Sequence, residues 1–408
     1  GSGASPFLIS TAGQLDNVRN YLGAAHSEKH FQLTANLDLN VAPYNSGVGW
    51  IPIGTLAAPF SGRFDGGGHT ITGLFIDDTT RVSYAGLFGY IGADGQLGNL
   101  SLSNVEVTGP DYVGSMVGWN EGQVENVSAS GNVTGNFYVG GLLGKNKGSV
   151  ETGSFSGAVT GYWDYTGGLV GDNYGIVTDC HATADVNSSG DWVGGLAGGN
   201  FGPISDCSSS GMVAGDDSVG GLVGWNYTGN MGGVSYQGSV SDSSSSASVT
   251  AAGWDVGGLA GYNEGPVSGS RASGSVTSTD VCVGGLVGSN YRRISNSYAT
   301  GNVQGRNVVG VLVGYNGHQI PNCYAAGTVQ ATTAAAEAGG LVGSRGEGAN
   351  DIVAESFWDT TASGKPASAA GSGKTSFEMK QQSTFSAWDF SSVGGIDDTD
   401  NGGGPFLK

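Results

Sequence analysis

One six-residue phrase recurs at a nearly fixed interval, and it constrains the fold more than any other feature of this chain. Variants of Val-Gly-Gly-Leu-Val-Gly begin at Ala85, Val113, Val139, Thr166, Val193, Val219, Val256, Val283, Val309 and Ala338. The intervals between successive copies are 28, 26, 27, 27, 26, 37, 27, 26 and 29 residues. Such a period is too short for paired-helix repeats, and the Gly, Ser, Thr and Val between copies favour strands and turns. We therefore expect one coil of a β-solenoid per repeat.

Columns of equivalent residues support this interpretation. Three positions after each start most copies have Leu, as at Leu142 and Leu196, and seven positions after it they have Asn, as at Asn146. Equivalent residues of neighbouring coils lie about 4.8 Å apart. The leucines therefore predict a continuous inner stack, and the asparagines predict a ladder of amides bonded from coil to coil. The expected fold is all-β, a single-stranded, right-handed parallel β-helix of about ten coils of ~27 residues with capped ends.

The two ends of the chain depart from the repeat and are predicted to cap it. We expect an N-terminal capping region at 1–75 with a short helix and the first strands, the repeat β-helix at 76–345, and a C-terminal capping region at 346–408 with a short helix. The expected helices are Ala12–Leu22 after Ser10 or Thr11, and about Ser376–Gln382 after a capping box of Thr375 and Glu378. Covering the exposed edges of a solenoid prevents the addition of further chains.

Composition excludes several classes of partner. Only 12% of the residues are charged, and the net charge is −19. Nucleic-acid binding requires lysine and arginine to displace counterions, so we expect no nucleic-acid partner. The same charge disfavours polyanionic glycans and anionic membranes. The chain has no run of 18 or more apolar residues, so we expect no membrane insertion, and we expect a monomer.

The repeats also carry a family resemblance. The segment VGGLVGSNYRRISNSYATGNVQG at 283–305 resembles the GLUG motif of bacterial surface and secreted proteins. The lead-in PFSGRFDGGGHTITGL at 59–74 and the segments at 356–365 and 373–390 resemble the sequences that flank GLUG arrays. Proteins with such arrays include adhesin-like chains and IgA-peptidase-type polyproteins. The resemblance implies a β-solenoid that is secreted or at the cell surface, and it does not fix an activity.

A row of aspartates is the strongest candidate for chemistry. Asp164, Asp191 and Asp217 lie two positions before the repeat start in three consecutive coils. Neighbours in a regular stack would be about 5 Å apart and the outer two about 10 Å apart. Repulsion between carboxylates can supply a protonated acid and an ionised base, as glycosidases require. We predict that Asp191 is the general acid, with Asp164 or Asp217 as base or nucleophile. A solvated turn and a weak calcium site are the alternatives.

Rings and further carboxylates accompany this row. The predicted substrate-binding residues are Trp163, Tyr165, Asp172, Trp192, Trp225, Tyr227, Trp254, Asp255 and Glu264. Some of them form a second column, beside the asparagines, in which rings alternate with charges as in a groove for an extended glycan. The alternative is aromatic stacking that stabilises a corner of the solenoid. The 37-residue interval predicts a surface loop within Thr228–Gly238, directly after Trp225 and Tyr227.

Cysteine and histidine spacing gives no cofactor site. Cys180, Cys207 and Cys323 share an inward column, so we expect them to act as small buried hydrophobic residues. A Cys180–Cys207 disulfide is the alternative, although neighbouring parallel strands hold Cβ atoms slightly too far apart for good geometry. No Cys/His spacing resembles a zinc site. We expect no cofactor, with calcium as the one open option.

The sequence features favour two functions. The first is a secreted carbohydrate-active β-helix that binds and cleaves a neutral or weakly charged polysaccharide with paired carboxylates, as glycoside hydrolases do. The second is a non-catalytic, adhesin-like surface module that binds host or matrix glycans on the same face.

Overall fold

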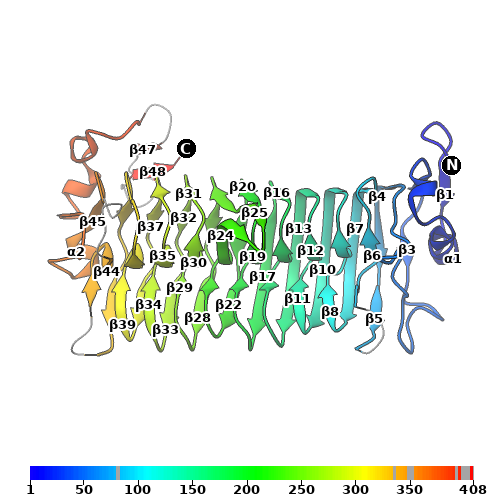
Figure 1. Cartoon of the computed structure of the whole chain (residues 1–408), viewed down its shortest axis with the longest axis horizontal. Coiled ribbons are helices and arrows are strands. Elements are labelled where there is room, and N and C mark those ends of the chain that lie inside the picture. Colours follow the sequence, from blue (N-terminus) through cyan, green and yellow to red (C-terminus); the bar gives the residue numbers. More distant parts are fainter. Residues whose placement is uncertain (80–82, 334–336, 347–352, 391–393, 397–404, 408) are drawn as a thin grey trace. The chain divides into compact units, whose positions relative to one another are not determined.

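The computed structural model describes the whole chain except residues 80–82, 334–336, 347–352, 391–393, 397–404 and 408. The chain divides into two compact units, Gly1–Ser209 (unit 1) and Ser210–Lys408 (unit 2). Each unit is a stack of coils made of short parallel strands (Figure 1), which confirms the expected all-β parallel β-helix. The coils number about 12. This exceeds the expected ten because segments that lack the repeat phrase, such as β2, β4 and β45 defined below, also pair with the stack.

Unit 1 contains three columns of paired strands. The first column has β1 (Phe7–Ile9), β2 (His30–Leu33), β3 (Leu37–Asp38), β4 (Arg63–Thr72), β5 (Phe75–Asp77), β7 (Gln96–Thr108), β10 (Gln123–Gly135), β13 (Ser149–Gly161), β16 (Ile176–Thr178), β17 (His181–Ser188) and β20 (Pro203–Ser205). The second has β8 (Asp111–Val113), β11 (Phe137–Gly140), β14 (Thr166–Gly167) and β18 (Val193–Gly194). The third has β6 (Phe88–Ile91), β9 (Val117–Asn120), β12 (Leu143–Asn146), β15 (Val170–Asn173) and β19 (Ala197–Asn200). Strand β21 (Ser208–Ser210) lies at the boundary between the units.

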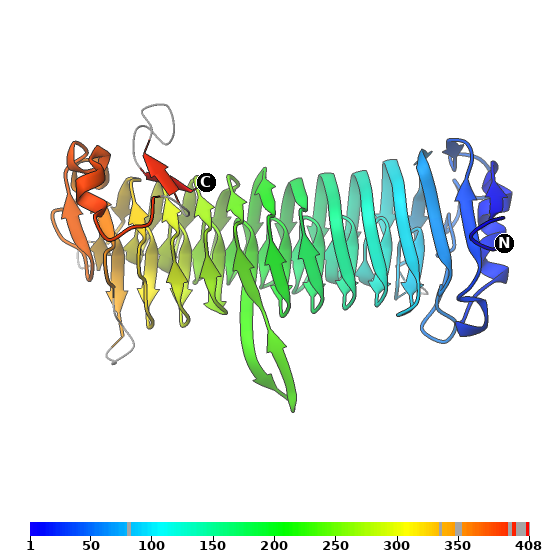
Figure 2. The same ribbon diagram turned by 90° about the horizontal axis from the view of Figure 1, so that it is seen from above.

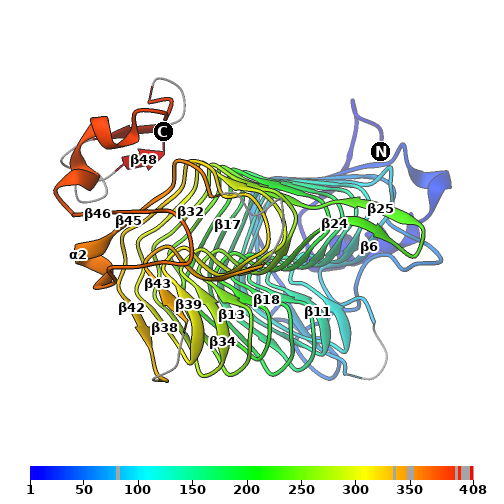
Figure 3. The same cartoon turned by 60° about the vertical axis from the view of Figure 1, so that its left-hand side comes forward.

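Unit 2 repeats these columns with shorter strands. The first column has β22 (Met212–Gly215), β26 (Ser239–Ser241), β27 (Ser244–Ser245), β28 (Ser248–Ala251), β31 (Val267–Ser268), β32 (Arg271–Ala272), β33 (Val276–Ser278), β36 (Ile294–Ser295), β37 (Tyr298–Ala299), β38 (Val303–Gly305), β41 (Tyr324–Ala325), β42 (Val329–Ala331), β45 (Phe357–Asp359) and β46 (Ser372–Lys374). The second has β23 (Val219–Gly220), β29 (Val256–Gly257), β34 (Val281–Gly284), β39 (Asn307–Gly310) and β43 (Ala338–Gly339). The third has β24 (Val223–Met231), β30 (Ala260–Glu264), β35 (Val287–Asn290), β40 (Val313–Asn316) and β44 (Val342–Arg345). Figure 3 shows the coils of these columns nested behind one another.

The core of each coil is the predicted leucine column. Leu142, Leu169 and Leu196 have no exposed surface, and neither do their counterparts in unit 2. The glycines of the phrase allow neighbouring coils to approach each other. A Cβ atom added at Gly168 would lie 2.1 Å from the carbonyl oxygen of Gly195 in the next coil. A larger residue there would therefore push the two coils apart.

The predicted asparagine ladder is present in both units. In unit 1 the Nδ2 atom of Asn146 donates to Oδ1 of Asn173 at 2.9 Å, and Asn120 makes the same bond to Asn146 at 2.9 Å. In unit 2 Asn226, Asn263, Asn290 and Asn316 are joined in the same way at 2.8 Å. All of these side chains are fully buried. The ladder therefore satisfies amide groups that could find no partner in an apolar interior.

The helices at the two ends are shorter than expected. At the N-terminus α1 spans Ala12–Asp16, followed by the 3₁₀ turns η1 (Asn17–Asn20) and η2 (Ala24–His26). Thr11 is the N-cap, with its hydroxyl accepting from the Gln14 N–H at 3.2 Å. The polar residues around Leu15 and Val18, the buried members of this segment, offer too little apolar surface to hold a longer helix against the stack.

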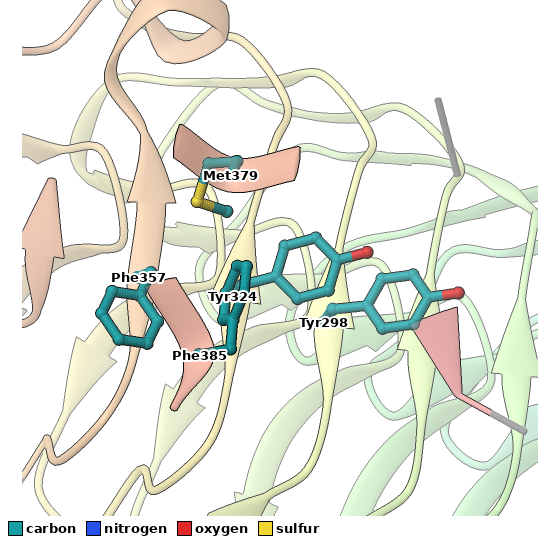
Figure 4. Close-up of a cluster of buried hydrophobic side chains, with 5 residues drawn as sticks. All are labelled: Tyr298, Tyr324, Phe357, Met379 and Phe385. Carbon is teal, nitrogen blue, oxygen red and sulfur yellow. The ribbon is translucent and has the colours of Figure 1, made fainter. Parts of the chain in front are cut away.

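The C-terminal segment packs on the outer face of the first strand column of unit 2. Its helical elements are α2 (Thr360–Ser363) and the 3₁₀ turns η3 (Glu378–Lys380) and η4 (Gln382–Phe385), and β47 (Gly394–Ile396) pairs with β48 (Pro405–Leu407). The predicted capping box forms, because the Thr375 N–H donates to Glu378 at 2.7 Å and the Glu378 N–H donates to Thr375 at 3.2 Å. It is followed by 3₁₀ turns rather than an α-helix. Met379 and Phe385 pack there against Tyr298, Tyr324 and Phe357 (Figure 4).

The extra residues of the 37-residue interval form a β-hairpin, which lies within the predicted range Thr228–Gly238. Strand β24 runs beyond its coil and pairs antiparallel with β25 (Val234–Gln237), through a turn at Gly232 and Gly233. The hairpin extends away from the coils of unit 2 (Figure 2). The coil resumes directly after the hairpin, since Val240 pairs with Val267 of the next coil.

Cys180, Cys207 and Cys323 are buried, as expected for an inward column, and none of these three forms a disulfide. The Cys180 thiol donates to the Thr178 carbonyl oxygen, with 3.1 Å between the heavy atoms, and accepts from the Gly153 N–H at 3.3 Å. In unit 2 Cys323 occupies this position, and Ser243, Ser270 and Ser297 occupy it in the preceding coils, where Ser270 donates to the Ser268 carbonyl oxygen at 2.8 Å. The cysteine thiol and the serine hydroxyl therefore make the same hydrogen bond to the carbonyl oxygen two residues earlier, and this turn forms without a disulfide.

Candidate functional site

The turn before each repeat start is built on residues with left-handed backbone. In unit 1 Tyr112, Tyr138, Tyr165 and Trp192 have φ values of 52°, 57°, 64° and 55°. This conformation is strained for residues with a Cβ atom, so it persists only where packing holds it. Here the rings stack from coil to coil, with centroids 4.7 Å apart for Tyr112–Tyr138, 5.1 Å for Tyr138–Tyr165 and 4.7 Å for Tyr165–Trp192. Tyr165 and Trp192, predicted to bind substrate, are members of this structural stack.

Two of the three predicted catalytic aspartates, Asp164 and Asp217, hydrogen-bond to the turn of the next coil through their side chains. Asp164 and Asp191 are half-buried, and Oδ1 of Asp164 accepts from the backbone N–H of Asp191 at 3.1 Å. In unit 2 Oδ1 of Asp217 accepts from the Trp254 N–H at 2.9 Å in the same manner. Burial raises the pKa of Asp217, and the Trp254 N–H partly offsets this. One oxygen of Asp164 and one of Asp217 are therefore engaged in turn structure.

The rings of Phe137 and Trp163 stack beside the aspartate row in unit 1, and we call this pair the Phe137–Trp163 platform. The side chain of Trp163 is 57% exposed. Its indole stacks on the ring of Phe137 in the preceding coil, with 5.9 Å between centroids and 14° between planes. Tyr162 is 54% exposed. In unit 2 Trp254 is also 54% exposed. Of the predicted binding residues in unit 1, Trp163 is the one that offers a whole ring face to solvent.

Asp172 lies in a different environment from the one expected. It is fully buried and pairs in register with Lys145 of the preceding coil, with 2.8 Å between Nζ and Oδ2. Three rings surround the ammonium group, those of Trp119 at 5.0 Å, Tyr138 at 5.1 Å and Tyr174 at 4.2 Å from Nζ. Burial raises the pKa of Asp172 to about 6, and Lys145 limits the rise. The column beside the asparagines, to which Lys145 and Asp172 belong, was expected to be exposed. The stacked rings of the turn before the repeat start, which include Tyr138 and Tyr165, cover it at this point.

Unit 2 places its candidate carboxylates beside hydrogen-bond donors. The Nε1 atom of Trp225 donates to Oε2 of Glu264 at 3.1 Å, and the ring of Trp225 lies 5.3 Å from that of Tyr227. The Ser289 hydroxyl donates to Oδ1 of Asp255. Burial raises the pKa of Asp255 to about 6, and the Ser289 hydrogen bond lowers it. The pKa of the Asp255 carboxyl group therefore lies above its ordinary range.

A shallow polar groove on unit 1 was not predicted. Cavities of about 300 and 390 Å³ lie over strands β7, β10, β13 and β17. The residues that line the first of them include Asn99, Asn126, Thr152, Asp179 and His181. The first four have left-handed φ values, from 51° to 53°. Asn126 and Asp179 lie thirteen positions after their repeat starts, and this recurrence was the available signal, because Asn and Asp tolerate this conformation best.

Outside the residues excluded above, no group of three or more His, Cys, Asp or Glu side chains is arranged to hold a metal ion. Within the same part of the chain, no helix has the length and apolar character needed to cross a membrane.

Comparison with known proteins identifies the repeat. A sequence model of the GLUG motif matches residues 165–187 and 279–304. The recurring phrase is part of a GLUG motif. Both matches lie within the coils described above, so the GLUG motif of this chain folds as a parallel β-solenoid.

This chain spans only a small part of the length of two relatives that it matches. A protein of Evansella cellulosilytica named "Putative Gly-rich membrane protein" is 46% identical over 131 residues, which is 31% of this chain and 15% of that protein. "Halomucin" of Haloquadratum walsbyi is 35% identical over 135 residues, which is 32% of this chain and 1% of that protein. The solved structure of a "putative immunoglobulin A1 protease" from Bacteroides ovatus matches all of this chain and 94% of its own, at 19% identity and a TM-score of 0.36.

Proposed function

We propose that this protein is a non-catalytic, secreted or cell-surface module that binds an uncharged glycan on the Phe137–Trp163 platform of unit 1. The observation behind the proposal is the exposed indole of Trp163, held nearly parallel to a supporting ring at 14°. Exposing so large an apolar ring to water is unfavourable unless a partner covers it. The apolar face of a sugar ring is such a partner, and its hydroxyl groups remain free for the polar turn beside it.

The surrounding charge supports a neutral ligand. Asp164 and Asp191 follow the platform in the turn row, and the whole chain has a net charge of −19. Carboxylates accept hydrogen bonds from sugar hydroxyl groups and repel anionic glycans. The relatives named as a membrane protein and as halomucin support a location at or outside the cell surface.

Glycoside hydrolysis is the second candidate. It is favoured by the contact between Asp164 and Asp191, which places two consecutive members of the aspartate row within one hydrogen bond of each other. In that case Asp191 would be the general acid, and Asp191→Asn would lower turnover by about 10²-fold or more. The binding proposal ranks higher because one Asp164 oxygen is engaged with backbone and Asp172 is inaccessible.

A glycan array followed by titration of the best ligand tests the proposal. We expect Trp163→Ala to weaken binding at least tenfold, while Trp254→Ala, which removes an equally exposed indole from unit 2, leaves affinity unchanged. Equal affinities for the Trp163→Ala variant and the parent would exclude the platform. Release of reducing ends by the parent but not by Asp191→Asn would establish the hydrolase instead.

A further inference from the structure

The ion pair of Lys145 and Asp172 has the geometry of two groups ready to condense. The residues are direct partners on the neighbouring parallel strands β12 and β15. The Nζ atom lies 2.8 Å from Oδ2, so the amine is next to the carboxyl carbon that it would attack. Both side chains are buried, with 8% of Lys145 and none of Asp172 exposed.

The surroundings of the pair disfavour two separate charges. Three aromatic rings lie within 5.1 Å of Nζ, and their faces attract the ammonium group but supply no hydrogen-bond acceptor as strong as water. In the part of the chain that the structure describes, Oδ1 of Asp172 has no hydrogen-bond partner. Burying an ion pair that is not fully hydrogen-bonded is expensive, because the contacts of the two ions replace only part of the hydration that they lose. A neutral product would remove this cost.

We propose that Lys145 and Asp172 form an isopeptide bond that covalently joins two neighbouring coils. A proton moves from the ammonium group to the carboxylate across the short contact, which gives a neutral amine and a neutral acid. The Nζ lone pair then attacks Cγ of Asp172, the N–C bond forms, and one carboxyl oxygen leaves as water. Atoms and charges balance, since an ammonium and a carboxylate become one amide and one water, and no co-reactant is needed.

The environment assists each step. Burial raises the pKa of Asp172 to about 6, so the neutral acid required for attack is accessible near neutral pH. The side chain of Tyr174 also hydrogen-bonds to the Asp172 carboxyl group, which helps to fix its orientation. The fixed register of the two strands holds amine and acid together, and such positioning replaces an external activating reagent.

Two other cation–carboxylate contacts lack the buried primary amine of the Lys145–Asp172 pair. The pairs Arg19–Asp16 and Arg306–Asp280 are partly exposed and use guanidinium groups. A guanidinium stays protonated in proteins and is therefore a poor nucleophile. Lys147 lies near the Trp119 ring, at 4.9 Å, but it is exposed.

Mass spectrometry of the purified, denatured full-length protein tests the proposal directly. We expect an intact mass lower than the sequence mass by one water molecule, and a tryptic map in which one branched peptide joins the segments containing Lys145 and Asp172. Lys147→Arg should keep both signatures, and Lys145→Met should lose both. Circular dichroism would confirm that each protein is folded.

A parent protein of full sequence mass that is cleaved by trypsin after Lys145 would overturn the proposal. A loss of water that maps to other residues would do the same. The parent map decides the question even if Lys145→Met does not fold.

Discussion

Removing one amide from the middle of the asparagine ladder should cost far more stability than removing an exposed asparagine. Asn146 is fully buried, donates to Asn173 and accepts from Asn120, each at 2.9 Å. Asn146→Ala therefore removes the ladder partner of two buried amide groups, although Nδ2 of Asn120 keeps its contacts with the Gly122 and Ser149 carbonyl oxygens at 3.2 and 3.3 Å. Each such group costs about 1–3 kcal/mol, so we expect a loss of roughly 2–6 kcal/mol in the free energy of unfolding.

Urea unfolding followed by both circular dichroism and tryptophan fluorescence would measure this loss. Two probes are needed because a stack of repeats can unfold in parts, and only coincident transitions give a single free energy. The matched control is Asn132→Ala, an exposed strand residue whose partner in the next coil is already Ala158. The control should change stability by no more than about 0.5 kcal/mol. If Asn146→Ala costs no more than Asn132→Ala, the ladder does not stabilise the fold.

Three further changes test other parts of the structure. Leu196→Ala should lower the free energy of unfolding by roughly 2–5 kcal/mol, because the coils on either side cannot collapse into the gap; a loss below about 0.5 kcal/mol in urea unfolding would place this column at the surface. Asp255, whose pKa is about 6 in the folded state and near 4 in the unfolded chain, binds more protons when folded between these values, so its contribution to stability increases as the pH falls from above 6 to about 4. Asp255→Asn should remove about 1–3 kcal/mol of this change in pH-dependent unfolding, and identical pH profiles would contradict the assignment. Replacing Gly229–Tyr236 by a tight turn should leave the midpoint of thermal unfolding nearly unchanged, because the Asn226–Asn263 pair lies within the coil; a large decrease would show that the hairpin supports unit 2.

The fold could be predicted from sequence because every coil repeats the same physical constraint. Leu196 must be inside since its equivalents in the neighbouring coils are, and the buried Asn146 amide makes its shortest hydrogen bond to the equivalent asparagine of the next coil. The insertion at Thr228–Gln237 was located for the same reason, since it interrupts a fixed period. The extent of the terminal helices could not be predicted, because it depends on contacts with the stack that follow no repeat.

The candidate site was harder to predict because a column gives the spacing of side chains but not what covers them. The sequence predicted that the column of Asp172, beside the asparagines, and the turn of Trp163, before the repeat start, would both be exposed. In the structure Asp172 is fully buried, whereas Trp163 is 57% exposed. The difference arises from the left-handed turn residues Tyr138 and Tyr165, whose rings fold back over the neighbouring column. The distinction between bonded and available carboxylate oxygens, as in Asp164, likewise requires three-dimensional coordinates.

The hydrogen bonds of the asparagine ladder all run in one direction. In every described pair the Nδ2 atom donates to the coil that follows in sequence, from Asn120 toward Asn146 and from Asn290 toward Asn316. Aligned amide dipoles add rather than cancel, so the first coil of a ladder presents an oxygen and the last presents an N–H. At that last position Asn316 donates to the His318 carbonyl oxygen at 2.7 Å. The two faces of such a coil are thus electrically unlike, and a new coil gained by gene duplication can extend the ladder only head to tail.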